Sequence, residues 1–161
     1  MKQLKILAIA ALALVTLRSS SCKKSDFTPV ASVGSWHVNG TPYTAKTVTK
    51  YSVDLSGMAA DGVNYASVFV SGMPGSAPDA GTNYKIVGYD KMNQLADDEC
   101  IVQITTSSTD MYVSTAHNGG TMNLKVNNDR ISMTVPAIWA THYVSYSAQQ
   151  DSVKVDASLA E

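Results

Sequence analysis

The feature that most constrains the fold is a two-residue alternation of apolar and polar side chains near the C-terminus. On both sides of Asn128-Asp129 every second residue is apolar, and these residues are Met122, Leu124, Val126, Ile131, Met133 and Val135. A period of two places such side chains on one face of a strand, whereas a helix needs a period of about 3.6. The segment 122–135 therefore predicts a β-hairpin with one buried face and one solvated face.

Most of the remaining chain also reads as strands. Val153, Val155, Ala157 and Leu159 alternate with polar residues, and the dipeptide Asn39-Gly40 predicts a tight type I′ hairpin turn. The stretch 63–72 is apolar on both faces, which indicates a central strand, and the prolines and glycines of 73–81 indicate a loop. A helical turn is expected only within 91–99.

Eight to ten short strands at regular spacing are typical of an all-β protein. We expect an antiparallel β-sandwich, with an up-and-down β-barrel as the alternative. The length of 161 residues fits one such domain, which we place at 33–161.

The N-terminus predicts a secretion signal. A short basic stretch precedes 12 apolar residues, Ile6 to Leu17, and this run is shorter than the roughly 20 residues that a membrane-spanning helix needs. Small residues precede Cys22, so cleavage after Ser21 would make Cys22 the first mature residue. We therefore expect a signal peptide at 1–21 and a polar, flexible tether at 22–32.

This arrangement resembles a bacterial lipoprotein signal of the Bacteroidota type, although Ser19 replaces the leucine usual three residues before the cysteine. The resemblance implies lipidation of Cys22. The pattern W-x-V-N-G-x-x-Y-x-A from Trp36, followed by "GTNYKI" and "DSVKVDASLAE", is similar to a group of small, uncharacterised lipoprotein domains of these bacteria. That resemblance implies an all-β fold and a place in the cell envelope, most simply the outer membrane, and it brings no catalytic residue.

The two cysteines and the net charge limit the possible covalent links and partners of the chain. A disulfide between Cys22 and Cys100 is the alternative to lipidation, but Cys100 stands among apolar residues and is expected to be a buried thiol. Removal of 1–21 would leave nine basic and 13 acidic residues, a net charge of −4. Such a chain lacks the basic stripe that nucleic acid requires.

No local motif predicts catalysis, a metal or a cofactor. His37, His117 and His142 are widely spaced, so a zinc site would require them to converge in space. A Ser-His-Asp arrangement is the alternative for a chain rich in serine, but the sequence has no Gly-x-Ser-x-Gly turn to support it. The acids 97–99 lack the spacing of a calcium loop and are expected to form a solvated turn. No glycine-rich phosphate loop is present either.

Surface aromatic residues offer the remaining site. Pro136 is expected to break the preceding strand, and after it Trp139 and Tyr143 share a parity opposite to Ile138 and Val144. If the aliphatic side chains face the core, Trp139 and Tyr143 form an outward ligand face. The alternative is that Trp139 is packed beneath a neighbouring loop. Trp36 is expected in the core.

These observations favour a lipid-anchored, non-enzymatic binding or accessory module that engages a glycan, a small ligand or an envelope protein. The alternatives are a hydrolase whose catalytic residues are dispersed in sequence and a purely structural envelope protein.

The anchor hypothesis predicts the effect of one substitution. Cys22→Ala should shift the protein from the membrane fraction into a soluble periplasmic or secreted form, because several acyl chains hold a protein at a bilayer far more firmly than one. Mass spectrometry of protein purified from membranes should show a mass above that of the polypeptide. A mature protein without added mass would contradict the prediction.

Overall fold

The computed structural model describes residues 33–52, 54–70, 82–116, 120–128 and 130–161. The signal peptide, the tether, Cys22 and the whole of the expected loop at 73–81 lie outside these ranges. The elements are β1 (Val33–Val38), β2 (Thr41–Thr44), β3 (Thr47–Lys50), β4 (Asp54–Met58), β5 (Tyr65–Val70), β6 (Thr82–Ile86), the 3-10 turn η1 (Tyr89–Lys91), β7 (Glu99–Thr105), β8 (Asp110–Ser114), β9 (Thr121–Asn127), β10 (Arg130–Val144) and β11 (Ser147–Ala160).

The all-β prediction is confirmed. The eleven strands of the described chain form one sheet in the order β2-β1-β11-β10-β9-β6-β7-β5-β4-β3. Strand β8 lies off this path and pairs with both β10 and β7, so that β10, β9, β6, β7 and β8 close into a five-stranded barrel. No helix in the described ranges is long and apolar enough to cross a membrane.

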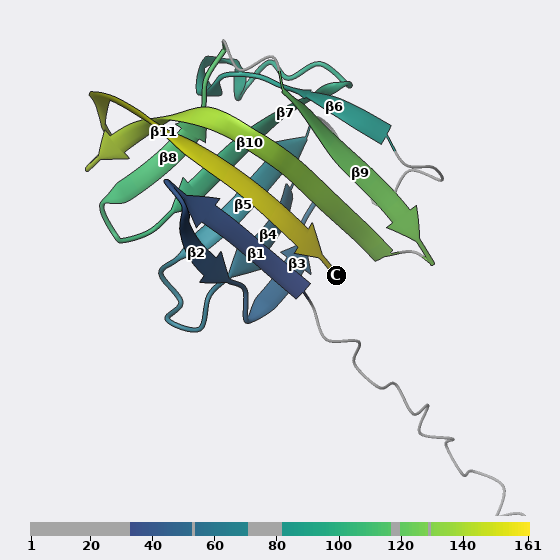
Figure 1. Ribbon diagram of the computed structural model, residues 1–161. Helices are drawn as coiled ribbons and strands as arrows, with labels where there is room; N and C mark the ends of the chain where they lie inside the picture. The colour runs from purple at the N-terminus through teal and green to yellow at the C-terminus, as the bar shows by residue number, and fades with distance from the viewer. Residues whose placement is uncertain (1–32, 53, 71–81, 117–119, 129) are drawn as a thin grey trace, which may run out of the picture.

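Two wings extend from this barrel. In Figure 1, β10 and β11 cross the front of the molecule as long curved strands with β1 beside β11, and β4 and β5 lie behind them. Strand β1 contacts β3, and β11 contacts β4, so the two wings face each other across the core. The fold thus combines a small closed barrel with two facing layers.

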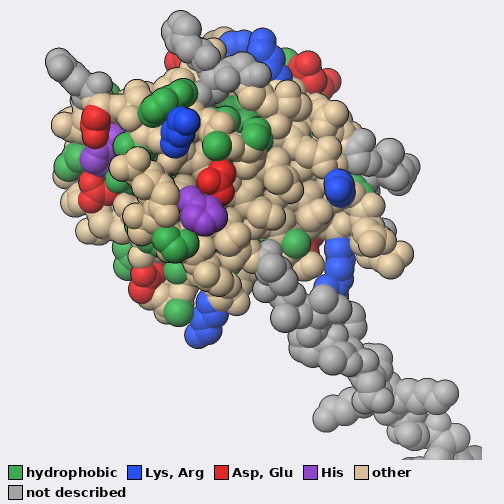
Figure 2. All heavy atoms as spheres, viewed as in Figure 1, with side chains coloured by type: hydrophobic (Ala, Val, Ile, Leu, Met, Phe, Trp, Pro, Cys, Tyr) green, Lys and Arg blue, Asp and Glu red, His purple; other side chains and the backbone are tan. Residues whose placement is uncertain are grey.

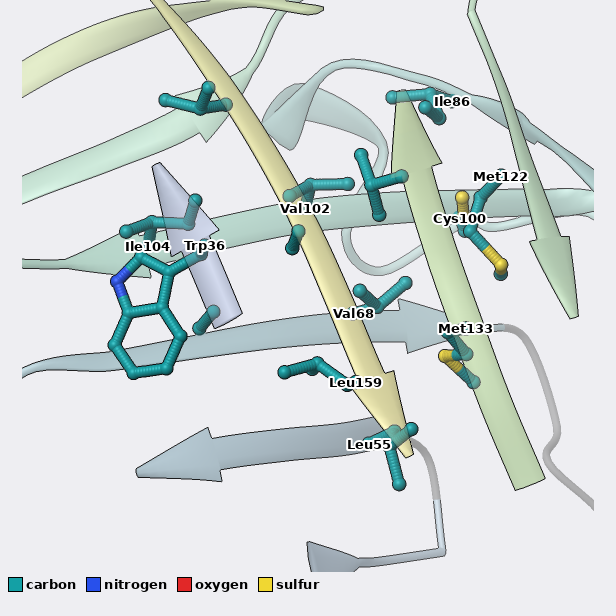
Figure 3. Close-up of a cluster of buried hydrophobic side chains, with 14 of the residues drawn as sticks. Trp36, Leu55, Val68, Ile86, Cys100, Val102, Ile104, Met122, Met133 and Leu159 are labelled. Atoms are coloured by element: carbon teal, nitrogen blue, oxygen red, sulfur yellow. The ribbon is translucent and has the colours of Figure 1, made fainter. Parts of the chain in front are cut away.

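The core fills the space that these strands enclose. Figure 3 shows Trp36, Leu55, Val68 and Leu159 pointing into the same space from different strands, and all four are almost fully buried. The wings approach closely at Gly57, where an added Cβ would lie 2.6 Å from Leu159 Cδ2. A larger residue at position 57 would therefore force the Leu159 side chain to shift.

The alternation near the C-terminus has the predicted consequence. Leu124 on β9 pairs with Met133 on β10, and the six apolar residues of the predicted inward face are buried or, for Val126, partly buried against the core. The turn at Asn39-Gly40 has positive φ angles of 50° and 81°, as a type I′ hairpin requires. Strand β5 lies between β4 and β7 and is central, as expected.

The interpretation of Pro136 as a strand break is wrong. Strand β10 continues through it, with a register irregularity against β11 between Val135 and Ile138. Pairing with β9 ends at Thr134 and pairing with β8 begins at Ala140, so Pro136 lies where β10 has no strand partner on that side within the described chain. Proline lacks an N–H donor and is tolerated at such a gap.

Truncation of the C-terminal hairpin should distinguish its two faces. Leu124→Ala should lower the free energy of unfolding by about 2–5 kcal/mol, because Leu124 is fully buried. Lys125→Ala, on the exposed face, should change it by no more than about 0.5 kcal/mol. Chemical denaturation measures both values, and equal losses would contradict this assignment of faces.

Candidate functional site

The outer face of the barrel carries a continuous row of side chains across four strands. Tyr65 on β5 pairs with Thr105 on β7, Thr105 pairs with Met111 on β8, and Met111 pairs with Tyr143 on β10. Directly paired residues lie on the same face of a sheet. Residues 65 and 143 are far apart in sequence, and strand register alone brings them to one surface.

A second small hydrophobic cluster supports this face. Val87, Ile101 and Val113 are buried there, with Met111 and Tyr143 packed against them. Met92 and Leu95, which follow η1, cover the same cluster. The chain after β6 is thereby fixed against this cluster, and Tyr89 of η1 shares a groove with Tyr65 and Tyr143.

An open groove of about 460 Å³ lies along the row. Its walls are the η1 turn, the loop between β7 and β8, and the tip of the β10–β11 hairpin. The lining residues are Tyr65, Tyr89, Gln103, Thr105, Ser107, Ser108, Thr109, Asp110, Met111, Tyr143, Ser145 and Tyr146. We call this feature the tyrosine groove, because four of these residues are tyrosines.

The polar groups of the groove are neutral except for one carboxylate. The Gln103 amide donates a hydrogen bond to the Tyr65 hydroxyl at 2.9 Å, which leaves its carbonyl oxygen as an acceptor. No lysine or arginine is among the lining residues. The groove therefore combines aromatic rings with hydroxyl and amide groups and offers no cation to bind an anion.

Asp110 is already satisfied by protein donors. Its Oδ2 accepts hydrogen bonds from the hydroxyls of Ser107, at 2.5 Å, and Thr109, at 3.2 Å, and its Oδ1 lies 2.9 Å from His142 Nε2. The bonds from Ser107 and His142 lower the pKa of Asp110 below its ordinary value. This carboxylate organises the loop at the end of the groove.

The hairpin tip adopts an unusual backbone conformation. Ser145 and Tyr146 have positive φ angles of 48° and 66°, a region where bulky residues are rare. The Ser145 N–H donates to the Thr109 carbonyl at 2.9 Å, which fixes the tip against the loop before β8. Tyr146 is 90% exposed and stands at the rim of the groove. Strained residues of this kind concentrate at functional sites.

The two predicted ligand-face residues are placed differently. Trp139 is 52% exposed on β10, with the Lys154 ammonium 5.3 Å from its ring centroid, and it does not line the groove. Tyr143 lines the groove and packs against the second cluster. Trp36 is buried, as expected, and stacks on Tyr43 with ring centroids 5.9 Å apart.

The two described histidines do not converge. His37 pairs with Asp156 at 2.8 Å on the β1–β11 surface, and His142 lies between Asp110 and Asp151. Figure 2 shows two histidine side chains at separate places on this view of the molecule, and the basic side chains there are scattered. His117 lies outside the described residues, among which no cluster of three metal-ligating side chains is found.

The geometry around Asp110 does not match a serine hydrolase. In a catalytic triad the histidine lies between serine and aspartate and accepts the serine proton. Here Asp110 lies between Ser107 and His142, and the Ser107 hydroxyl donates to the carboxylate. Nothing in this arrangement activates the Ser107 oxygen as a nucleophile.

The structure also bears out the buried thiol expected at Cys100 and corrects one residue of the acidic turn at 97–99. Cys100 is fully buried and free, and burial raises the pKa of its thiol to about 12, so it behaves as a small hydrophobic residue. Asp97 and Asp98 are exposed as expected, but Glu99 is not. It is buried, bonds to Lys91 Nζ at 2.8 Å and accepts the Ala96 N–H, which ties η1 to β7.

Comparisons with known proteins do not extend this description. No family model matches the chain, and no match is found among curated proteins or among solved structures. The functional interpretation therefore rests on the groove itself.

The strained tip predicts that stability can be gained at the groove. Tyr146→Gly should raise the free energy of unfolding by about 1 kcal/mol, because a side chain in the left-handed region costs about 1–2 kcal/mol and glycine avoids most of it. Tyr51→Gly is the control, since Tyr51 is also exposed but has no positive φ. Thermal denaturation that shows equal or lower stability for Tyr146→Gly would contradict the strain.

Proposed function

We propose that this protein is a lipid-anchored, non-enzymatic binding module whose tyrosine groove takes an uncharged glycan chain. The observation that carries the proposal is the combination of four tyrosines with Gln103 and hydroxyl groups in an open groove without a lysine or arginine. We propose that acyl chains on Cys22 hold the module at the outer membrane.

Glycans match this lining in two respects. The C–H faces of a sugar ring are apolar and flat and pack against aromatic rings, while the ring hydroxyls need hydrogen-bond donors and acceptors. Tyr89 and Tyr146 expose their rings at the rim, and Gln103 can offer its amide oxygen as an acceptor. An anionic ligand would meet the Asp110 carboxylate in a groove whose lining residues include no lysine or arginine.

The groove is remote from the point where the chain enters the domain. Val33 pairs with Ala160 at one end of β11, whereas Tyr146 precedes the other end, roughly 40 Å away along the strand. In Figure 1 the start of β1 and the tip of the β10–β11 hairpin lie at opposite sides of the molecule. An anchor at Cys22 would leave the groove accessible on the side away from the membrane.

Binding rather than hydrolysis is favoured by the chemistry of the groove. Glycoside hydrolysis generally uses two carboxyl groups that flank the scissile bond. Asp110 is the single carboxylate among the lining residues, and its oxygens are held by Ser107, Thr109 and His142.

Calorimetric titration with neutral oligosaccharides, such as cellohexaose, laminarihexaose and chitohexaose, tests the proposal. Wild-type protein should bind at least one of them. Tyr146→Ala and Tyr89→Ala should each weaken that binding about three- to tenfold, the range that one aromatic contact contributes.

Tyr51→Ala is the matched control, because Tyr51 is 55% exposed and lies outside the groove. It should bind as the wild type does. If Tyr51→Ala and Tyr146→Ala weaken binding equally, the groove is not the site. If no neutral oligosaccharide binds while an acidic one does, the assigned ligand class is wrong.

A further inference from the structure

The imidazole of His142 bridges two carboxylates that belong to different strands. Its Nε2 lies 2.9 Å from Asp110 Oδ1 on β8, and its Nδ1 lies 3.3 Å from Asp151 Oδ2 on β11. The ring stacks on Tyr112 with centroids 4.6 Å apart and an interplanar angle of 13°. The side chain of His142 is only 17% exposed, so neighbouring groups hold the ring in place.

The bridge spans an irregularity in the hairpin. Thr141 pairs with Ser152 and Tyr143 with Ala148, so the β11 residues 149–151 lie opposite His142 alone. Such a bulge bends a strand and redirects the side chains beyond it. Asp151 belongs to the bulge, and Tyr146 lies beyond it at the tip. The hydrogen bond between Asp151 and His142 therefore influences the position of Tyr146.

This part of β11 has little other support. Strand β1 pairs with β11 from Val155 onward. Before that residue, the stretch 147–153 has β10 as its strand neighbour, and no other strand pairs with it among the described residues. Side chains that fix the bulge consequently have a large influence on the hairpin tip.

Only a protonated imidazole can make both bonds. Imidazolium donates from both nitrogens, whereas neutral histidine donates from one and presents a lone pair at the other. Asp110 retains the Ser107 and Thr109 donors, while Asp151 is 59% exposed and its bond is longer. Loss of the proton should therefore break the contact with Asp151 and keep the contact with Asp110.

The surrounding charges favour the protonated form. Burial lowers the pKa of His142, but the hydrogen bonds to Asp110 and Asp151 outweigh it and hold the pKa above the ordinary 6.5. The other titratable groups nearby are Tyr112 on β8 and, near that tyrosine, Tyr43 on β2. Burial raises the pKa of Tyr112, so its hydroxyl carries no charge near neutral pH.

We propose that His142 is a positioning residue which, when protonated, locks the β11 bulge and holds Tyr146 at the rim of the tyrosine groove. Deprotonation releases Asp151, and the hairpin tip then becomes mobile. The consequence for ligand binding rests on the function proposed above, whereas the movement of the tip does not.

Amide hydrogen exchange of residues 146–151 tests, without any ligand, whether protonated His142 locks the hairpin tip. Because the pKa of His142 is raised by folding, the lock is complete below pH 6.5 and is lost as pH rises through that raised pKa. Between about pH 5.5 and about pH 8.5, protection of these amides, corrected for intrinsic exchange, should fall at least about threefold in the wild type.

Asp151→Asn should remove this pH dependence, because an amide can pair with either form of the imidazole. Asp156→Asn is the matched control: it changes the other histidine–aspartate pair, with His37, and should leave the profile of 146–151 as in the wild type. Identical profiles for wild type and Asp151→Asn would overturn the proposal.

Titration with chitohexaose, or with cellohexaose if it binds more tightly, distinguishes failure of the His142 positioning role from failure of the proposed glycan binding. Affinity of the wild type should fall about three- to tenfold over the same pH range, and that of Asp151→Asn should stay level. PH-dependent exchange without any sugar binding would support the positioning role and refute the glycan ligand. Sugar binding at a constant affinity across the range would refute the positioning role.

Discussion

The double pairing of β8 is the constraint on which the rest of the structure depends. Without it, the strands would form an open curved sheet with β7 and β10 at separate places in the order. Residues 111–113 of β8 pair with both strands, and this closure fixes the register of β5, β7, β8 and β10 relative to one another. The row from Tyr65 to Tyr143, and hence the tyrosine groove, follows from that register.

Stability and function are divided between the two sides of the sheet. The inner side is a closely packed core in which Gly57 admits Leu159 and Trp36 is fully buried. The outer side at the barrel end carries positive φ angles at Ser145 and Tyr146, a bulge opposite His142, and an open groove. Local strain of this kind persists only when surrounding contacts over-determine the backbone. The long β10–β11 pairing supplies those contacts.

The local parts of the fold could be predicted from sequence because they depend on neighbours in the chain. The alternation around Leu124 and Met133 and the Asn39-Gly40 dipeptide were sufficient to predict two hairpins. The alternation also predicted which face of the C-terminal hairpin is buried. The tip of the longest hairpin was missed, because Ser145-Tyr146 lacks the asparagine and glycine typical of such a turn. The sequence also predicted that Pro136 ends a strand, whereas β10 continues through it. The effect of a proline depends on which strands lie beside it, and the sequence does not show this.

The candidate site could be predicted only in part. Parity along one strand correctly grouped Trp139 with Tyr143 on an outward face, but it carried no information about Tyr65, Tyr89 or Gln103, which reach the groove from other elements. Barrel closure and the η1 segment over the second hydrophobic cluster determine that Tyr143 lines the groove and that Trp139 does not. These are non-local effects that a single sequence does not encode in any short window.

The proposed function requires that the ligand binds in the tyrosine groove and not on the exposed surface around Trp139. Mapping amide chemical-shift changes while a neutral oligosaccharide is added tests it most directly. The largest changes should occur at Gln103, Thr105 and Tyr143, and those at Lys154 should be small. Changes confined to the surroundings of Trp139 and Lys154, with a silent groove, would contradict it.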